Sequence, residues 1–481
     1  MNIPFVGAAY TVRSPNLDCQ NCINLYPVID ESGEGKSIKA LYGTPGTRLL
    51  STLTGIGGVR GMLKLTSTSA VAVQGSSVFM LDNNFAATFV GSLLSTNGPV
   101  SIETNGASAV IVDGPNGYSI NLSDNSFAQI VDAAFYGSKQ VHYLDNYYIF
   151  VRPDTQQFYI SGLGTVTFDA LDFASSDGEP GNIVTHFVDH REIWIFSTVS
   201  TALFVDSGGG DFPFVRTDTA IEVGCAAPYS VCKIDNSIMW VGQDKQGPGL
   251  VWKANGYTPV RASTEALEFA IQNYSRIDDA IAYSYQDEGH SFYVLTFPTA
   301  NKTWVYDAGV SAALGQNVWH ERAWRNPSDA TLNRHRSNCH MYFGGEHIVG
   351  DFENGNLYAL DLDYYSDNGD PLPAIRTTPH ISNPDEYWMY WDRLTIQAEG
   401  GVGLQTGQGS DPQILLDWSD DGGHVFGNKH QISIGRVGKY RNRAFITRMG
   451  RSRDRVLRIT ITDPVKRAIT GAHAKIRLGS S

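Results

Sequence analysis

The sequence predicts an all-β protein: a β-propeller of six or seven irregular blades with an additional smaller β domain. Three observations lead to this prediction, namely the composition, a recurring hairpin pattern and a Pro-rich break near residue 370. Of the 481 residues, 42% are hydrophobic and 11% aromatic, and there are 49 Gly and 20 Pro. Such a composition is typical of many short strands joined by tight turns. The length suits one large repeat-built domain and a smaller one.

A β-hairpin pattern recurs between residues 60 and 360. An alternating apolar strand is followed by a turn of Asp, Asn or Gly and by a second strand rich in Ile, Val, Tyr and Trp. The clearest copies are residues 141–151, 183–196 and 231–241, whose turns begin 44 and 46 residues apart at Asp145, Asp189 and Asp235. Weaker copies centre on Gly75, Asn105-Gly106, Asp287-Glu288-Gly289 and Gly344-Gly345. A period of about 40–45 residues is typical of a propeller, because each blade buries its faces by stacking on its neighbours.

One helix is expected within the propeller, over residues 264–274, as an insertion between two blades. Ser263 is the predicted N-cap, and Glu265 lies in the first turn, where the helix dipole favours a carboxylate. The apolar residues that fall on one side of this helix are Leu267, Ala270 and Ile271.

A Pro-rich stretch between Asp370 and Pro384 breaks the repeat and is the predicted domain boundary. We expect an N-terminal segment, residues 1–50, that packs with the C-terminal platform, then the propeller, residues 51–370, and a C-terminal β domain with a basic module, residues 371–481. The end of this last domain alternates in polarity. The residues expected to share a face are Arg451, Arg453 and Arg455, and then Arg458, Thr460 and Thr462 opposite Ile459 and Ile461.

The formal charge of −13 is distributed unevenly along the chain. From Lys429 onward, 14 Lys and Arg stand against only two Asp, a local charge of +12, whereas the preceding part has 22 basic and 47 acidic residues, a charge of −25. The C-terminal end is therefore a basic module on an acidic body.

The cysteines and the N-terminus indicate folding in the cytoplasm. The five Cys, an odd number in a long chain, do not indicate a disulfide framework. The N-terminal sequence lacks a basic segment followed by an apolar one, and no stretch reaches 18 uninterrupted apolar residues. We therefore expect neither a signal peptide nor a membrane-spanning segment.

Several short strings, in order along nearly the whole chain, resemble a known family: the packaged-DNA stabilization proteins, also called tail-hub or nozzle proteins, of short-tailed bacteriophages. The strings are Asn24-Leu25-Tyr26-Pro27, Leu41-Tyr42-Gly43-Thr44-Pro45-Gly46, Phe212-Pro213-Phe214, Gly224-Cys225-Ala226-Ala227-Pro228, Ala254-Asn255-Gly256-Tyr257, Trp418-Ser419-Asp420-Asp421-Gly422-Gly423-His424, Gly438-Lys439-Tyr440-Arg441, Arg453-Asp454-Arg455-Val456 and Asp463-Pro464-Val465-Lys466. Val425 and Phe426 depart from the Thr and Trp of the family's pattern.

The resemblance implies a structural, non-enzymatic virion protein that folds and assembles in the host cytoplasm. It implies a cyclic ring, a hexamer, below the portal and its adaptor, which closes the DNA exit channel and forms part of the ejection conduit. Further implied partners are the tail needle, a tail fibre or a tailspike, and the packaged double-stranded DNA. The family brings neither catalytic residues nor a cofactor.

The basic module supplies candidate residues for contact with DNA or with protein: Arg436, Lys439, Arg441, Arg443, Arg448, Arg451, Arg453, Arg455 and Arg458. Such residues displace counterions from DNA phosphates. Alternatively, their guanidinium groups bind carboxylates of a neighbouring subunit or adaptor, where bidentate geometry favours Arg over Lys. We favour the protein interface, because tight phosphate binding would also hold DNA back during ejection.

Two groups of residues have some features of metal sites, but we expect no metal. Cys19 and Cys22 have thiolate-ligand spacing, yet a zinc needs two more ligands, which could come only from a distant cluster. That cluster comprises His335, Cys339, His340 and His347. A loop of Asp361, Asp363, Asp367, Asn368 and Asp370 has calcium-type oxygen ligands but lacks the EF-hand order, so a solvated acidic turn is expected.

The segment with Ser419, Asp421 and Gly423 approximates the Asp-box of propeller blade hairpins, and we expect a structural turn there. In such a turn the Asp accepts backbone N–H groups and the Gly permits positive φ. The alternative function is a propeller-type glycan-binding or glycan-processing tail protein. Glycan processing of the sialidase type would need arginines, a Tyr and a Glu that converge in one axial pocket. The sequence has no motif for a nucleophile or a P-loop.

Overall fold

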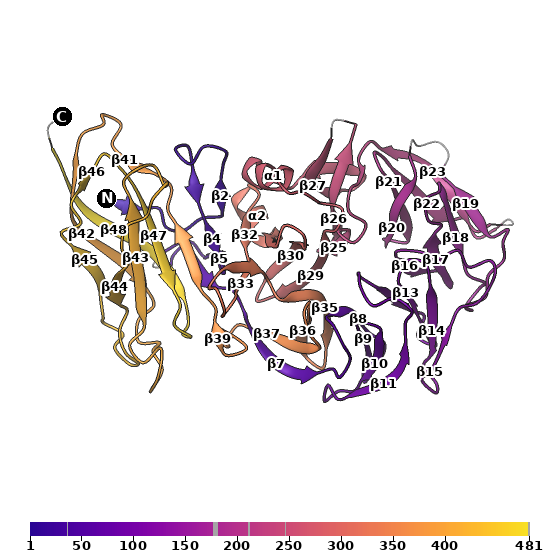
Figure 1. Cartoon of the computed structure of the whole chain (residues 1–481). Coiled ribbons are helices and arrows are strands. Elements are labelled where there is room, and N and C mark those ends of the chain that lie inside the picture. Colours follow the sequence, from indigo (N-terminus) through magenta and orange to yellow (C-terminus); the bar gives the residue numbers. More distant parts are fainter. Residues whose placement is uncertain (36, 177–180, 210–211, 246, 480–481) are drawn as a thin grey trace.

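Seven β-sheets surround a central axis and lie beside a β-sandwich in the computed structural model, which describes residues 1–35, 37–176, 181–209, 212–245 and 247–479 (Figure 1). Neighbouring sheets contact each other in a closed order: β8 with β12, β12 with β16, β16 with β20, β21 with β24, β25 with β29, β29 with β35 and β35 with β8. This cyclic order makes the described ring a propeller of seven blades.

The first four blades are consecutive antiparallel sheets of four strands each. Blade 1 is β8 (Val59–Lys64), β9 (Ala70–Gln74), β10 (Ser77–Leu81) and β11 (Ala87–Ser92). Blade 2 is β12 (Ser101–Thr104), β13 (Ser108–Val112), β14 (Gly117–Asn121) and β15 (Ser126–Gln129). Blade 3 is β16 (Val141–Leu144), β17 (Tyr147–Val151), β18 (Gln157–Ile160) and β19 (Phe173–Ser175). Blade 4 is β20 (Ile183–Asp189), β21 (Glu192–Ser197), β22 (Thr201–Asp206) and β23 (Phe214–Ile221).

The last three blades are less regular. Blade 5 is β24 (Gly224–Cys225), β25 (Cys232–Ile234), β26 (Ser237–Asp244), β27 (Gly247–Asn255) and β28 (Thr258–Arg261). Blade 6 is β29 (Ile281–Asp287), β30 (His290–Phe297), β31 (Lys302–Asp307) and β32 (Trp319–Glu321). The hairpin of β33 (Ala323–Arg325) and β34 (Leu332–Arg334) precedes blade 7, which is β35 (Ser337–Phe343), β36 (Glu346–Asp351), β37 (Asn356–Asp361) and β7 (Gly46–Thr52).

The turns singled out in the sequence are the hairpins of the blades. Asp145 and Asn146, for example, both have positive φ between β16 and β17, as a two-residue hairpin of this twist requires. In blade 1, however, Gly75 joins the second and third strands and not the first two. The first hairpin of blade 1 escaped the pattern because its turn uses Thr66, whose hydroxyl accepts the N–H groups of Thr68 and Ser69.

Strand β7, from the N-terminal part of the chain, closes the ring. It pairs antiparallel with β37, which lies about 310 residues further along the chain, and is the fourth strand of blade 7. Beyond β7 the sheet continues through the short strands β38 (Ser366–Asp367) and β39 (Asp370–Pro371). The boundary expected between the N-terminal segment, residues 1–50, and the propeller, residues 51–370, falls within β7. The seventh blade is thus built from both ends of the propeller segment.

Two short helices occur among the described residues, α1 (Glu265–Gln272) and α2 (Ala308–Leu314). The first lies between blades 5 and 6, as predicted, but its N-cap is Thr264, whose hydroxyl accepts the N–H of Leu267. The predicted cap was wrong because the Ser263 hydroxyl donates to the carboxylate of Glu268. The second helix was not predicted. Neither helix is long and apolar enough to cross a membrane.

The sandwich contains N-terminal as well as C-terminal strands. One sheet comprises β42 (Met389–Ala398), β45 (Ala444–Thr447), β46 (Arg451–Ser452), β48 (Ala468–Leu478), β1 (Asn2–Ile3), β5 (Leu25–Ile29) and β6 (Lys39–Gly43). The other comprises β4 (Cys22–Ile23), β40 (Ala374–Thr377), β41 (Ile381–Ser382), β43 (Gln413–Ser419), β44 (His430–Ser433) and β47 (Asp454–Ile461). Leu394, Leu416 and Ile459 pack in the core between them.

The second sheet of the sandwich continues into the propeller. β4 pairs with β40 on one side and in parallel with β32 of blade 6 on the other, so that ten strands form one sheet. The buried guanidinium of Arg376, on β40, donates to the backbone oxygens of Phe5, Ala8 and Asn21. The N-terminal segment is thereby tied to the junction, and both chain ends lie at the sandwich (Figure 1).

Candidate functional site

The nine residues of the basic module fall into two groups with different environments. Seven are exposed: Arg436, Lys439, Arg441, Arg443, Arg448, Arg451 and Arg453. The other two, Arg455 and Arg458, are bound by carboxylates of the sandwich itself. Only the first group is therefore free to meet a partner.

Arg455 is a structural residue of the sandwich. It is 1% exposed, its carbon Cζ lies 4.9 Å from the ring of Trp391 and 5.2 Å from that of Trp418, and it donates to both carboxylate oxygens of Asp420. The prediction that it shares a face with Arg451 and Arg453 was wrong. Arg453 lies between β46 and β47, and these two strands belong to different sheets. The alternation of side chains therefore does not continue from Arg451 to Arg455.

Arg458 binds the buried carboxylate of Asp417 through two hydrogen bonds of 3.0 and 2.6 Å. Its guanidinium also lies 3.8 Å from the ring centre of Phe426, one of the two positions that depart from the family pattern. Phe426 thus supplies a flat face for this cation. Ile459 and Ile461 point into the core on the opposite side of β47, as the alternation predicts.

Arg451 and Arg453 both lie over Trp388, at 4.3 and 4.9 Å from its ring centre. Neither has a carboxylate partner in the described part of the chain, so their N–H groups remain available at the surface. Stacking on an indole holds a guanidinium flat while its edge can still bind an anion. Within the exposed basic group, these two arginines are the ones that stack on a Trp ring.

The loop after β44 forms a concave basic surface. A cavity of about 640 Å³ is lined by Asp411, Ser433, Gly435, Arg436, Gly438, Lys439, Tyr440, Arg441 and Asn442. Arg436 is only 3.9 Å from the carboxylate of Asp411 and is largely exposed. The Tyr440 side chain is 77% exposed. Exposed Tyr and Arg side chains side by side are characteristic of protein interfaces.

The turn of Ser419, Asp421 and Gly423 follows β43 and lies in the sandwich, not at a blade hairpin. Asp421 accepts the N–H of Val425, and the Ser419 hydroxyl accepts that of Gly423, which has a φ of +88°. The hydroxyl of Ser419 and the N–H of Val425 lower the pKa of the Asp421 carboxyl. All three residues therefore stabilise the backbone of this turn: Ser419 and Asp421 accept its N–H groups, and Gly423 adopts its positive φ.

The residues considered as metal ligands lie in separate environments. Burial raises the pKa of the Cys22 thiol to about 11, and the thiol donates to the carbonyl of Leu25. His340 and His347 contact each other at 3.1 Å within blade 7. In the acidic loop, burial raises the pKa of Asp367 to about 6, and its carboxyl accepts the Thr47 hydroxyl. The described residues contain no group of three or more His, Cys, Asp or Glu placed to hold a metal ion.

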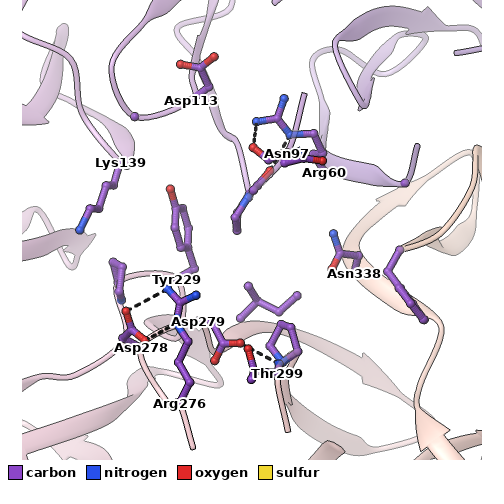
Figure 2. A pocket seen from close by; sticks show the side chains of 18 of the residues that line it. Arg60, Asn97, Asp113, Lys139, Tyr229, Arg276, Asp278, Asp279, Thr299 and Asn338 are labelled. Carbon is purple, nitrogen blue, oxygen red and sulfur yellow. Dashed lines mark hydrogen bonds and ion pairs between the residues drawn. The ribbon is translucent and has the colours of Figure 1, made fainter. Parts of the chain in front are cut away.

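A pocket at the propeller axis was not predicted. It has a volume of about 720 Å³ and is lined by residues of all seven blades and their connections, which the sequence separates by nearly 300 residues. Figure 2 shows Lys139, Tyr229 and Asn338 around its open centre, with Asp113 and Arg60 on one side and Asp278 and Asp279 on the other. No local motif could reveal a site that only the cyclic order of the blades assembles.

The polar residues of the pocket differ in how many of their donor and acceptor groups have a hydrogen-bond partner. Arg60 is buried and donates to the carbonyls of residues 75, 95, 97 and 98, so it serves the backbone. Arg276 is paired with Asp278 at 2.6 Å. By contrast, the side chain of Arg334 has no hydrogen bond or ion pair among the described residues. Burial lowers the pKa of Arg334 to about 10.

The pocket does not match the arrangement expected for glycan processing. Arginines and Tyr229 do converge on it, but the carboxylates that line it in the described structure belong to Asp113, Asp278 and Asp279. Burial raises the pKa of Tyr229 to about 12, so the phenol stays protonated at neutral pH. An activated Tyr would need an adjacent base.

Comparison with known proteins divides the chain between residues 365 and 374, close to the start of the C-terminal strands of the sandwich. A family model described as the bacteriophage P22 Gp10 β-propeller matches residues 1–365, and one described as the bacteriophage P22 Gp10 β-sandwich matches residues 374–477. These matches confirm the predicted fold class. No curated protein matches the chain.

Solved structures similar to the chain include the WD40 β-propeller domain of Doa1, at 12% identity and a TM-score of 0.40, covering 66% of this chain and 98% of that one. The computationally designed Ika8 protein is 12% identical with a TM-score of 0.39, covering 71% and 99%. YCF48 from Cyanidioschyzon merolae is 13% identical with a TM-score of 0.40, covering 66% and 99%.

Proposed function

Because the chain belongs to the bacteriophage P22 Gp10 family of structural phage proteins, we propose that six copies of it form a closed ring on the tail axis, below the portal and its adaptor. The ring closes the DNA exit channel, retains packaged DNA and forms part of the ejection conduit. The protein folds and assembles in the host cytoplasm and acts in the virion tail without catalysis. The family match over both parts of the chain is the observation that carries this proposal.

The junction between sandwich and propeller supports a mechanical role. The two parts share a ten-stranded sheet, and Arg376 ties the N-terminal segment to it through three backbone oxygens. Backbone hydrogen bonds across the junction resist relative motion better than a flexible linker would. A subunit that holds DNA under pressure needs such a connection between its parts.

The exposed part of the basic module is the proposed contact with an acidic protein surface, either of a neighbouring copy or of the adaptor. Arg451 and Arg453, held flat on Trp388, can bind carboxylates through two N–H groups at once. The acidic remainder of the chain, at −25, supplies complementary charge on an adjacent copy. The tail needle, a tail fibre or a tailspike, and DNA in the channel, are the other proposed partners.

Particles assembled without the protein test the proposed role. They should package DNA and then lose it, and electron microscopy of complete tails should show six copies around the axis. Particles that stay filled and infectious without the protein would contradict the role in DNA retention. A different copy number would contradict only the hexamer.

A further inference from the structure

Arg334 in the axial pocket is a buried cation that forms no hydrogen bond or ion pair with a carboxylate of the described residues; Asp279, Asp351 and Glu353 act on it only through their charge. Arg334 is 8% exposed, its carbon Cζ lies 3.8 Å from the ring centre of Phe352, and its Nη1 atom is shielded from solvent without a hydrogen-bond partner among the described residues. An Arg side chain remains protonated in proteins, so this charge persists. A buried charge without a hydrogen-bonded partner is unfavourable, and a bound anion would stabilise it.

The nearest arginine along the chain shows what Arg334 lacks. Arg336, also near the ring of Phe352, donates to both oxygens of Asp351 and to Glu353. Those carboxylates are therefore already engaged. Arg334 instead faces a cavity to which Lys139 also contributes, and Lys139 forms no hydrogen bond or ion pair with the described residues. Two cations without a hydrogen-bonded carboxylate among the described residues thus line one pocket.

The same pocket holds unused hydrogen-bonding groups of a second kind. The Asp279 carboxylate accepts the N–H of Thr299 with one oxygen, while its other oxygen is buried without a donor. Asn338 donates to the Val59 carbonyl, and its own oxygen remains free to accept. A ligand that satisfies the pocket must therefore carry both an anionic group and O–H or N–H donors a short distance away.

We propose that the axial pocket binds a carboxylate-bearing sugar, whose carboxylate is held by Arg334 and Lys139 and whose hydroxyl groups donate to Asp279 and Asn338. The Tyr229 hydroxyl, which points into the open centre in Figure 2, is placed to meet a further polar group. Uronic and sialic acids combine these features within one or two rings, and the cavity of about 720 Å³ accommodates that size. An acidic peptide would supply the carboxylate but fewer hydroxyl donors.

Calorimetric titration of the full chain tests the proposal with glucuronic acid, N-acetylneuraminic acid, neutral glucose, acetate and a hexaglutamate peptide. An acidic sugar should bind at least about tenfold more tightly than glucose and acetate, because charge-assisted bonds and hydroxyl bonds act together. Binding of acetate as tight as that of the acidic sugars would overturn the sugar class. Preference for the peptide would do the same, and absence of binding by every probe would overturn the site.

Substitutions locate the binding within the pocket. Arg334→Met and, independently, Lys139→Met should each weaken binding of the acidic sugar at least about tenfold, since each removes a charged donor. Arg325→Met is the matched control, because Arg325 lies on the same hairpin as Arg334 but outside the pocket. Lys139 is exposed, so its variant should fold even if Arg334→Met does not. Unchanged binding in the Lys139 variant would overturn its assigned role.

Discussion

At the residue scale, the environment of each arginine decides what it does. Arg60 and Arg376 are buried and donate to backbone carbonyls, which satisfies donors that would otherwise be costly to bury. Arg455 and Arg458 are bound by carboxylates in the sandwich. Arg334 alone among these five has no such partner. Arginine thus has three roles in this protein: it donates to backbone carbonyls, it forms ion pairs, or, as we propose for Arg334, it binds a ligand.

Replacement of Arg455 by Ala should destabilise the sandwich by about 3 kcal/mol, because it removes a buried cation, its packing between two Trp rings and its bonds to Asp420. The matched control is Arg453→Ala, an exposed arginine of the same segment, for which we expect less than about 1 kcal/mol. Urea unfolding measures both. Equal effects of the two substitutions would show that burial of Arg455 is not important.

At the element scale, closure of the propeller depends on one strand pairing across the ends of the repeat. β7 brings Gly46 against the loop after β37, where a Cβ atom would overlap the carbonyl oxygens of Tyr364 and Ser366. Backbone carbonyls cannot move aside as a flexible side chain can. A glycine is therefore required for close approach at this position.

Gly46→Ala should destabilise the protein by about 3 kcal/mol, since blade 7 must shift β7 or the loop to accommodate a methyl group. Gly209→Ala is the control, because no heavy atom of the described residues lies within 4 Å of the position that its Cβ atom would take. Its effect should stay within about 0.5 kcal/mol. Denaturant midpoints report both values, and a mild effect of Gly46→Ala would mean that ring closure tolerates displacement of β7.

The contact between blades 3 and 4 should be sensitive to acid. Burial lowers the pKa of His142 to about 4, and burial together with His142 lowers that of His186 well below 6.5; their ring centres are 4.7 Å apart. Well above pH 6.5 both imidazoles are neutral whether the chain is folded or unfolded. As the pH falls, the unfolded chain takes up protons first, so stability is lost between about pH 6.5 and 4.

His142→Gln should make this loss shallower by about 3 kcal/mol between pH 7 and 4, because the substituted side chain does not titrate. His424→Gln, at an exposed position, is the control and should leave the pH profile unchanged. Urea unfolding across this pH range gives the comparison. A profile of the His142 variant parallel to that of the original protein would show that His142 does not contribute.

At the scale of the whole molecule, charge is divided between two parts that one sheet connects. The C-terminal segment from Lys429 carries +12 and the rest −25. A rigid subunit of this kind can present its basic sandwich surface to the acidic surface of a neighbour in a closed ring. The exposed arginines, and not those paired inside the sandwich, are the ones that such an assembly would use.

Combined replacement of Arg441, Arg451 and Arg453 by Glu should block docking onto the adaptor or the neighbouring copy while the monomer stays folded. Each exposed charge contributes little alone, so single substitutions should be mild and the triple one disproportionately harmful. Arg13→Glu with Lys64→Glu, at other exposed positions, is the control. Assembly assays and thermal unfolding measure the two effects.

Contact with DNA predicts a different result for the same triple variant. Assembly would survive, but binding of duplex DNA would weaken and its salt dependence would flatten by about one unit per lost phosphate contact. Salt-titrated DNA binding therefore separates the two interpretations. Normal tails with altered DNA retention would contradict the protein interface.

The sequence by itself determined the all-β class, the propeller with its smaller β domain and the family. Local signals carry these features: Asp145-Asn146 and Gly344-Gly345 form turns wherever they occur, because only few residues adopt positive φ at low cost. The first hairpin of blade 1 was not predicted, because its turn is stabilised by the Thr66 hydroxyl, which accepts the N–H of Ser69, and not by a Gly or Asn with positive φ. Helix α2 lacked a charged first turn that would have indicated it.

Only the tertiary structure decided which residues meet. Arg451 and Arg455 have the spacing of one strand face, yet they belong to two sheets, and one is exposed while the other is buried. Lys139, Asp279 and Arg334 come together because seven blades close into a ring. Hairpins depend on neighbours along the chain, whereas burial, ion pairing and an axial pocket depend on contacts between distant segments, which no local pattern encodes.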